Sequence, residues 1–172
     1  VIGEIDGVVI VYTGRIDRCI RQPGRGIFVL DFKTTTMLGD TFWEDASVME
    51  AQRGYCYAIK ECLGEEPTGY IIRAIAVRAP TKTGTSIEFK EQTFYTKVPQ
   101  GQLDEWRNNM LNEAAEFLWH RSRNVWPMHH KHCIAKYGKC EFFNVCNGPA
   151  ASREDRLMSS DFKTHDWSPM YR

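Results

Sequence analysis

A chain of 172 residues is long enough for one domain with a proper hydrophobic core and too short for two large ones. Hydrophobic residues make up 42% of the sequence, but no stretch is apolar and long enough to cross a bilayer, so we expect no membrane partner. Lys+Arg and Asp+Glu are both 22. A net charge of zero argues against a protein that coats nucleic acid by bulk electrostatics, and it is compatible with local basic patches around an acidic metal site.

The first part of the chain predicts a β-hairpin. Residues 8–20 and 27–35 are rich in β-branched residues, which favour strands. They flank residues 22–26 (QPGRG), which form a strong turn signal. The two strands should therefore pair in antiparallel fashion around Gly24.

A helix is predicted over residues 46–63. Ser47 and Glu50 have the spacing of a capping box at its start, and Gly64 is a typical residue at a helix C-terminus.

Two further strands and a long helix follow. The strands are predicted over 70–78 and 86–98, and the helix over 101–121. We expect the apolar stripe of this helix to pack against the sheet; it consists of Leu103, Trp106, Met110, Ala114, Phe117 and Leu118. Helices and strands mix around one hairpin-rich sheet, which indicates the α/β or α+β class.

An acid and a lysine end the apolar strand that precedes the helix. Because side chains alternate across a strand, Ile27, Val29, Asp31 and Lys33 share one face. Burial of such charges is unfavourable unless they are paired or bind a metal. Two interpretations are open at this point, namely a simple ion pair at the strand end and a functional site.

The hairpin brings a second acid into the same place. If Gly24 is the centre of the turn, antiparallel partners have residue numbers that add to 48, which pairs Asp17 with Asp31. In that register the two Cβ atoms would lie about 4.5–5.5 Å apart on one face. Two carboxylates so placed repel unless a cation lies between them, and their hard oxygen atoms suit Mg²⁺ or Mn²⁺. A register shift of one residue would put the acids on opposite faces.

Two other strings repeat parts of this pattern. Residues 3–6 (GEID) are similar to residues 14–17 (GRID), but only Asp17 shares a hairpin with Asp31. Residues 161–164 (DFKT) repeat residues 31–34 without an apolar strand before them, and we interpret this repeat as a coincidence.

GRID (14–17) and VLDFKTT (29–35), followed by a helix with Gln52 and Tyr55, resemble the RecB-type branch of the PD-(D/E)XK nuclease superfamily. That branch includes phage-encoded and CRISPR-associated exonucleases. The resemblance covers most of residues 8–78 and implies an α/β fold of the restriction-endonuclease type, with a mixed sheet flanked by helices.

The resemblance also implies roles for individual residues. Asp17 and Asp31 would bind Mg²⁺ or Mn²⁺, and Lys33 would be the catalytic lysine. Gln52, with Tyr55 or a neighbour, would match the family's glutamine–tyrosine motif. The family spaces these two residues four apart, which the chain does not reproduce with Tyr55. From the residues alone, a surface glutamine beside a core tyrosine is a serious competing interpretation.

Three of the six cysteines, Cys133, Cys140 and Cys146, crowd into one C-terminal segment. Clustered cysteines often hold a metal, and Zn²⁺ with a histidine as fourth ligand is one chemically sound answer; the candidates are His129, His130 and His132. The resemblance implies instead a [4Fe–4S] cluster, whose fourth ligand we expect upstream of Val1. The remaining cysteines are expected in the core; they are Cys19, Cys56 and Cys62.

We expect three regions: a nuclease core over 1–126 that lacks its opening helix, a cysteine-rich cap over 127–148, and a polar tail over 149–172. The abrupt start, without Met or signal peptide, indicates a piece of a longer protein. The resemblance implies a cytoplasmic protein, either bacterial or from a phage in its host.

The expected function is that of a Mg²⁺-dependent deoxyribonuclease. By resemblance it would be an exonuclease in phage or bacterial DNA recombination or repair, with DNA and other recombination or replication proteins as partners. One alternative is a non-catalytic DNA-end-binding or recombination accessory module that retains the fold. Another is a structural zinc module, which would leave the acid pair unexplained.

Overall fold

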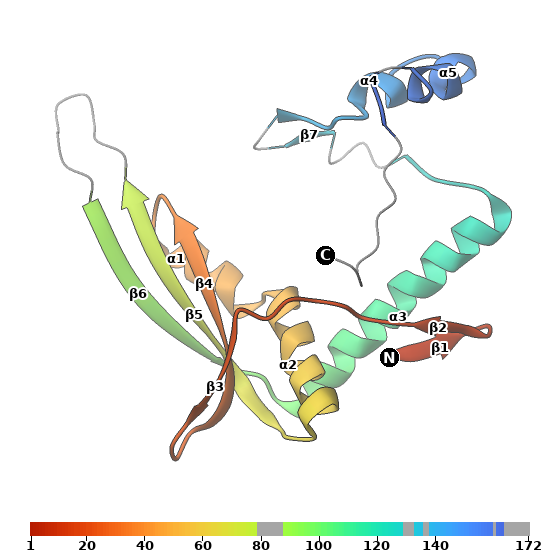
Figure 1. The fold of residues 1–172 in the computed structure, drawn as a ribbon. Helices are drawn as coiled ribbons and strands as arrows, with labels where there is room; N and C mark the ends of the chain where they lie inside the picture. The colour runs from red at the N-terminus through yellow and green to blue at the C-terminus, as the bar shows by residue number, and fades with distance from the viewer. Residues whose placement is uncertain (79–87, 129–132, 136–137, 160, 164–172) are drawn as a thin grey trace. The chain divides into compact units, whose positions relative to one another are not determined.

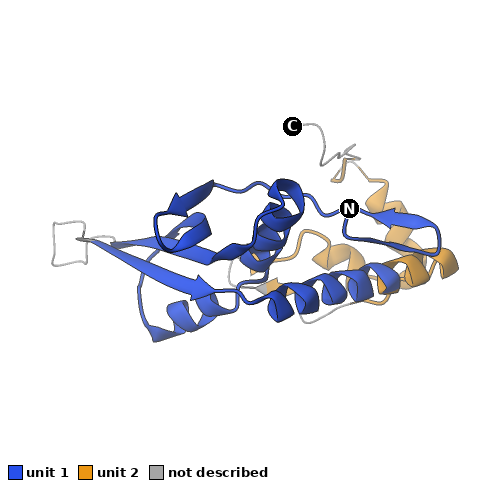
Figure 2. Ribbon diagram, turned by 90° about the horizontal axis from the view of Figure 1, so that it is seen from below, with its two compact units in different colours: residues 1–115 blue, residues 116–172 orange. Residues whose placement is uncertain are grey.

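The computed structural model describes residues 1–78, 88–128, 133–135, 138–159 and 161–163. The chain forms two compact units, residues 1–115 and 116–172, which are coloured separately in Figure 2. No helix in these described ranges is long and apolar enough to cross a membrane.

The first unit opens with a small hairpin of β1 (Gly3–Ile5) and β2 (Val8–Ile10). Asp6 and Gly7 form its turn with positive φ angles of 50° and 78°. The predicted strand over 8–20 is therefore wrong in its extent, because no regular structure connects β2 to the next strand at Arg18.

A four-stranded mixed sheet forms the centre of this unit (Figure 1). Its spatial order is β3-β4-β5-β6, where the bounds are β3 (Arg18–Gln22), β4 (Gly26–Thr35), β5 (Pro67–Arg78) and β6 (Glu88–Lys97). β3 and β4 form the predicted hairpin, with partners such as Cys19 and Val29 whose numbers add to 48. β5 runs parallel to β4, and β6 is antiparallel to β5.

Two helices connect the parallel strands β4 and β5, where the sequence predicts one. They are α1 (Asp40–Ser47) and α2 (Glu50–Leu63). The expected capping box is wrong, because the Ser47 hydroxyl donates to the Glu44 carbonyl at 2.6 Å and completes α1 instead. The predicted end is confirmed, since Gly64 closes α2 in the left-handed conformation with φ 66°.

The helices cover one face of the sheet and enclose the core with it. The strands contribute alternate residues to this core, among them Ile27, Val29, Tyr70, Ile72 and Ala74. Tyr70 also donates its buried hydroxyl to the carbonyl of Ala46 at 2.7 Å, which satisfies a carbonyl of the last turn of α1. Trp43 of α1 stacks on Phe94 of β6 with ring centroids 5.4 Å apart.

The long helix α3 (Gln100–Arg123) begins in the first unit and ends in the second. Leu103 and Trp106 are buried in the core, as the apolar stripe predicts. Phe117, in the same stripe, is 54% exposed. The expectation that the whole stripe packs against the sheet therefore holds only for the first part of the helix.

The second unit contains short elements. They are β7 (Ile134–Ala135), β8 (Gly138–Lys139), α4 (Phe143–Cys146), the 3₁₀ helix η2 (Ala150–Ser152) and α5 (Arg153–Leu157). The segment that the sequence presents as a polar tail thus carries a helical turn and a short helix in its described part.

Candidate active site

Asp31 and Lys33 lie on β4, at the end of its buried stretch. Asp31 is 7% exposed and shares the helix-covered face with Val29, as strand alternation requires. The Lys33 ammonium lies 2.8 Å from Asp31 Oδ2. The lysine thus partly neutralises a carboxylate that would be unfavourable to bury alone.

The two groups are in ionic contact without the geometry of a hydrogen bond. Asp31 Oδ2 is buried and has no hydrogen-bond partner among the described residues, although Lys33 Nζ stands within 2.8 Å. A buried oxygen of this kind retains unused acceptor capacity. It is therefore available to a further cation or to a water molecule.

Asp17 lies immediately before β3, one residue beyond its last paired position. The pairing of β3 with β4 ends at Arg18 and Leu30, and the same register continued by one step places Asp17 opposite Asp31. Asp17 Oδ2 accepts a hydrogen bond from the backbone N–H of Phe32 at 3.3 Å. The structure therefore brings Asp17 beside the strand segment that carries Asp31 and Lys33.

Two carboxylates and a lysine fit a Mg²⁺ or Mn²⁺ site with few protein ligands. No group of three or more His, Cys, Asp or Glu residues suited to a metal occurs within the described ranges. Mg²⁺ usually keeps several waters and uses one or two carboxylates together with substrate phosphates, so a pair of acids is sufficient. Asp31 Oδ2, which contacts the Lys33 ammonium but has no hydrogen-bond partner among the described residues, is the atom that such an ion would use.

Tyr55 of α2 packs against the glycine of the GRID string. A Cβ atom placed on Gly14 would lie 2.8 Å from Tyr55 Cε1, so the tyrosine ring can occupy this position only because Gly14 has no side chain. The contact fixes the segment that leads into Asp17 against α2. Tyr55 is therefore a neighbour of the site through Gly14.

Gln52 lies one turn earlier on the same helix and is 2% exposed. The interpretation as a surface glutamine is wrong. Its Oε1 atom has no hydrogen-bond partner in the described part of the chain. A buried amide without a partner is unfavourable, which makes Gln52 a candidate for contact with a ligand.

Tyr12 and Gly54 also position this segment, and the sequence reasoning missed both. The Tyr12 hydroxyl would lie 2.6 Å from a Cβ atom on Gly54, and its ring meets Trp106 edge-on at 4.9 Å. Burial, with smaller contributions from Tyr55 and Glu50, raises the pKa of Tyr12. Gly14 lies against Tyr55, and Gly54 lies against Tyr12. These two glycines are the sign of this close packing that the sequence contains.

In the part of the chain that the structure describes, the three C-terminal cysteines do not belong to a group that could hold a metal. Cys140 donates its backbone N–H to the Cys133 carbonyl at 2.9 Å, and Cys146 ends α4. Neither they nor any fourth residue of the described ranges form a cluster that could hold a metal. The candidate histidine ligands lie outside the described residues; they are His129, His130 and His132.

Only one of the other three cysteines is a core residue. Cys56 is fully buried, and its burial, with a smaller contribution from Cys19, raises its pKa to about 12. Cys19 and Cys62 are exposed, which corrects the expectation that all three lie in the core.

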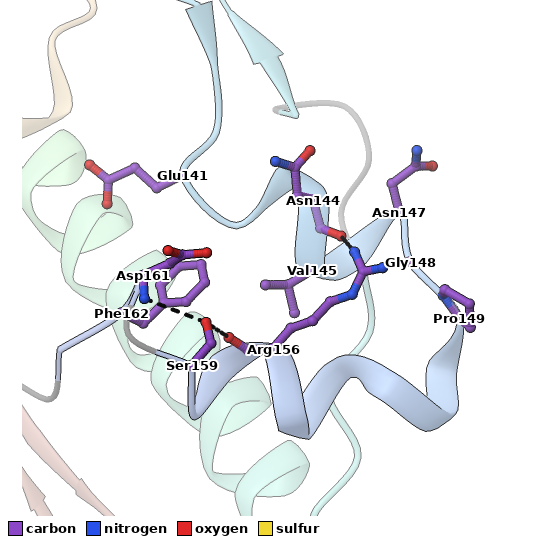
Figure 3. A pocket seen from close by; sticks show the side chains of 10 residues that line it. All are labelled: Glu141, Asn144, Val145, Asn147, Gly148, Pro149, Arg156, Ser159, Asp161 and Phe162. Atoms are coloured by element: carbon purple, nitrogen blue, oxygen red, sulfur yellow. Dashed lines mark hydrogen bonds between the residues drawn. The ribbon is translucent and has the colours of Figure 1, made fainter.

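The second unit contains a pocket lined by its own residues, among them Val145 and Asn147 on either side of Cys146 (Figure 3). Asp161 of the repeated DFKT string lies on its wall, together with Glu141 and Arg156. Arg156 donates to the carbonyl of Asn144 at 2.8 Å inside this wall. The repeated string therefore sits in a different environment from residues 31–34, which carry the buried acid.

Comparison with known protein families gives a match over most of the chain. The model of the PD-(D/E)XK nuclease superfamily matches residues 3–147. No curated protein matches the chain.

Proposed function

Because the chain belongs to the PD-(D/E)XK nuclease superfamily, we propose that it hydrolyses phosphodiester bonds of DNA with Mg²⁺ or Mn²⁺ held by Asp17 and Asp31. One observation carries this proposal. Asp17 accepts a hydrogen bond from the backbone N–H of Phe32, which stands between Asp31 and Lys33 on β4. Asp17 therefore lies beside the strand segment that carries the paired Asp31 and Lys33. A DNA-binding module without catalysis needs no such pair of acids.

The residues of the site would have different roles in the reaction. Asp31, whose buried Oδ2 atom has no hydrogen-bond partner among the described residues, and Asp17 would hold the ion. When bound, Mg²⁺ or Mn²⁺ would polarise a phosphate oxygen and increase the acidity of water. Lys33 is 38% exposed at its side chain, so its ammonium can turn from Asp31 towards a phosphate oxygen and stabilise the negative charge that develops there.

Gln52 and Tyr55 would complete the site from α2. The buried Gln52 amide has an unused acceptor and would orient a water molecule or a substrate group. Tyr55 would act as a positioning residue, because it packs on Gly14 and so fixes the approach of the chain to Asp17.

The narrower assignments rest on the resemblance to RecB-type nucleases. We propose exonucleolytic action in phage or bacterial DNA recombination or repair, in the cytoplasm and with recombination or replication proteins as partners. The three C-terminal cysteines do not meet as a metal site in the described residues, so no step is assigned to a [4Fe–4S] cluster or to Zn²⁺. The iron, acid-labile sulfide and zinc content of the purified protein tests separately whether these cysteines hold a [4Fe–4S] cluster or Zn²⁺.

The repeated DFKT string provides a matched control for the catalytic test. Asp31→Asn and Lys33→Ala should abolish digestion of DNA in the presence of Mg²⁺ or Mn²⁺. Asp161→Asn and Lys163→Ala, which make the same changes in the same local sequence, should not. Linear and circular substrates, each single- and double-stranded, separate exonuclease from endonuclease action.

Two results would overturn the assignment. Undiminished cleavage by Asp31→Asn or Lys33→Ala would exclude the proposed site. DNA binding in EDTA without cleavage by the unaltered protein in any divalent cation would favour the non-catalytic DNA-end-binding module.

A further inference from the structure

The end of α3 and the residues that follow it have a composition unlike that of the rest of the chain. Residues 117–140 contain no Asp or Glu, five of the 22 Lys and Arg residues, and four of the five His residues. The remainder therefore carries 17 basic residues against 22 acidic ones. A neutral chain thus has a cationic segment, although Lys131 and Lys136 lie outside the described residues.

The described part of this segment contains a contiguous group of four aromatic rings, three of which are about half exposed. Phe117, Trp119 and Trp126 are 54%, 50% and 52% exposed. Phe117 and Trp126 have ring centroids 5.3 Å apart, and His120 lies between Trp126 and Trp119 at 6.2 and 4.9 Å. The Arg123 guanidinium lies over the Trp119 ring at 4.8 Å from its centroid. We call these five residues the aromatic–arginine surface.

The exposure of the aromatic–arginine surface is unusual for a globular protein. Large aromatic side chains dominate the burial of apolar area, and a contiguous exposed group of them marks a binding surface more often than a chance arrangement. The charge of the segment narrows the choice of partner, because residues 117–140 carry five basic residues and no acid. The neighbouring acid, Glu116, lies 3.6 Å from the ring Nε2 of His120 at the edge of the surface. A partner with a negatively charged backbone and flat apolar groups satisfies both features.

We propose that the aromatic–arginine surface binds single-stranded DNA by base stacking. The proposal rests on the nuclease function and deepens it by naming the form of DNA that the protein holds. Unpaired bases stack on tryptophan rings and arginine planes while Lys and Arg neutralise the phosphates. Duplex DNA offers charge but keeps its base faces covered, so the rings select the single strand.

The test measures binding in EDTA, so that no cleavage takes place. A dye-labelled DNA strand of about 16 nucleotides is titrated with the full chain by fluorescence anisotropy, beside its duplex form. Trp119→Ala and Trp126→Ala should each weaken binding of the single strand by about tenfold, and leave duplex binding unchanged. Trp119→Phe keeps an aromatic face and should retain most of the affinity.

Tyr95→Ala is the matched control. Tyr95 is 47% exposed on β6 and has the guanidinium of Arg25 over its ring at 5.2 Å, so it reproduces the local arrangement outside the cationic segment. This variant should bind the single strand as the unaltered protein does.

Three results would overturn the inference. The first is undiminished affinity of both alanine variants for the single strand, and the second is an equal loss of affinity for the duplex. Alternatively, a dimer that Trp126→Ala converts to a monomer, with unchanged DNA affinity, would identify the surface as a contact between copies of the chain. A failure of the nuclease function is distinguishable from these results, since it would abolish cleavage in Mg²⁺ and leave the binding measured in EDTA intact.

Discussion

The backbone N–H of Phe32 donates a hydrogen bond to Asp17 Oδ2 at 3.3 Å. Phe32 stands between Asp31 and Lys33, so this contact ties Asp17 to the strand where the buried acid and its lysine lie. Asp17 itself is exposed. Its position therefore depends on the register of the hairpin and on one backbone donor, and not on side-chain packing.

Asp17→Asn should separate charge from shape at this position. The asparagine retains an acceptor for the Phe32 N–H, so stability should change by less than about 0.5 kcal/mol, as at other surface sites. Loss of the charge should lower kcat/KM in Mg²⁺ by at least about 100-fold, because metal polarisation contributes several kcal/mol to such reactions. Thermal melts and single-turnover cleavage measure the two effects. Full activity would remove Asp17 from the metal site.

Lys33→Met should make the stability of the fold more dependent on Mg²⁺. Without the ammonium at 2.8 Å, the buried Asp31 carboxylate has no cation beside it in the metal-free protein. Because the lysine is partly exposed, we expect a loss of about 1–3 kcal/mol in EDTA. Saturating Mg²⁺ should then raise Tm more than in the unaltered protein, since no ammonium competes with it. A smaller rise than in the unaltered protein would contradict the proposed shared use of Asp31.

Gly14→Ala should loosen the packing of α2 on the segment that leads to Asp17. The added methyl group would lie 2.8 Å from Tyr55 Cε1, and overpacking of this kind costs about 1–3 kcal/mol. Tm and cleavage should both fall. A second change, Tyr55→Leu, should recover part of the lost Tm.

Gly39→Ala is the control for this substitution. Nothing lies within 4 Å of a Cβ atom at Gly39, so its Tm should not fall. An equal fall in Tm for Gly39→Ala and Gly14→Ala would show that the Tyr55 contact is not the cause.

Cys56 should make the fold sensitive to alkaline pH. Burial raises its pKa to about 12, whereas an unfolded thiol titrates at about 8.5. As the pH rises, the Cys56 thiol therefore loses its proton in the unfolded state before it does so in the folded state. The contribution of this thiol to the free energy of unfolding is complete below about pH 8.5 and falls as the pH rises towards 12. Urea unfolding from pH 7 to 10 should show a steeper decline for the unaltered protein than for Cys56→Ala. Cys62→Ala, on the exposed side of α2, should follow the unaltered protein.

Tyr70→Phe should destabilise the fold without altering the chemistry of the site. It removes the hydroxyl that donates to the Ala46 carbonyl at 2.7 Å and leaves that carbonyl buried without its partner. The expected loss is about 1–3 kcal/mol. Urea unfolding should detect it, and kcat at a temperature well below Tm should be unchanged. A large loss of kcat under those conditions would show that the end of α1 has a further role in activity.

The sequence alone determined the hairpin and its register. Pro23 and Gly24 mark the turn, and alternation along β4 identifies the face that carries Asp31 and Lys33. These features are local, since a turn and the strands beside it are set by residues close in sequence. The observed pairing, in which partner numbers add to 48, follows from that local information.

Only the tertiary structure decided how the helices pack on the sheet and which of their side chains are buried. The break between α1 and α2, the burial of Gln52 and Cys56, and the packing of Tyr55 on Gly14 depend on residues distant in sequence. A run of helix-forming residues cannot reveal that the Ala46 carbonyl will be satisfied from β5, nor which face of a helix will meet a glycine. The same limit explains α3, whose apolar stripe is uniform in sequence, although only its first part meets the core and Phe117 remains exposed.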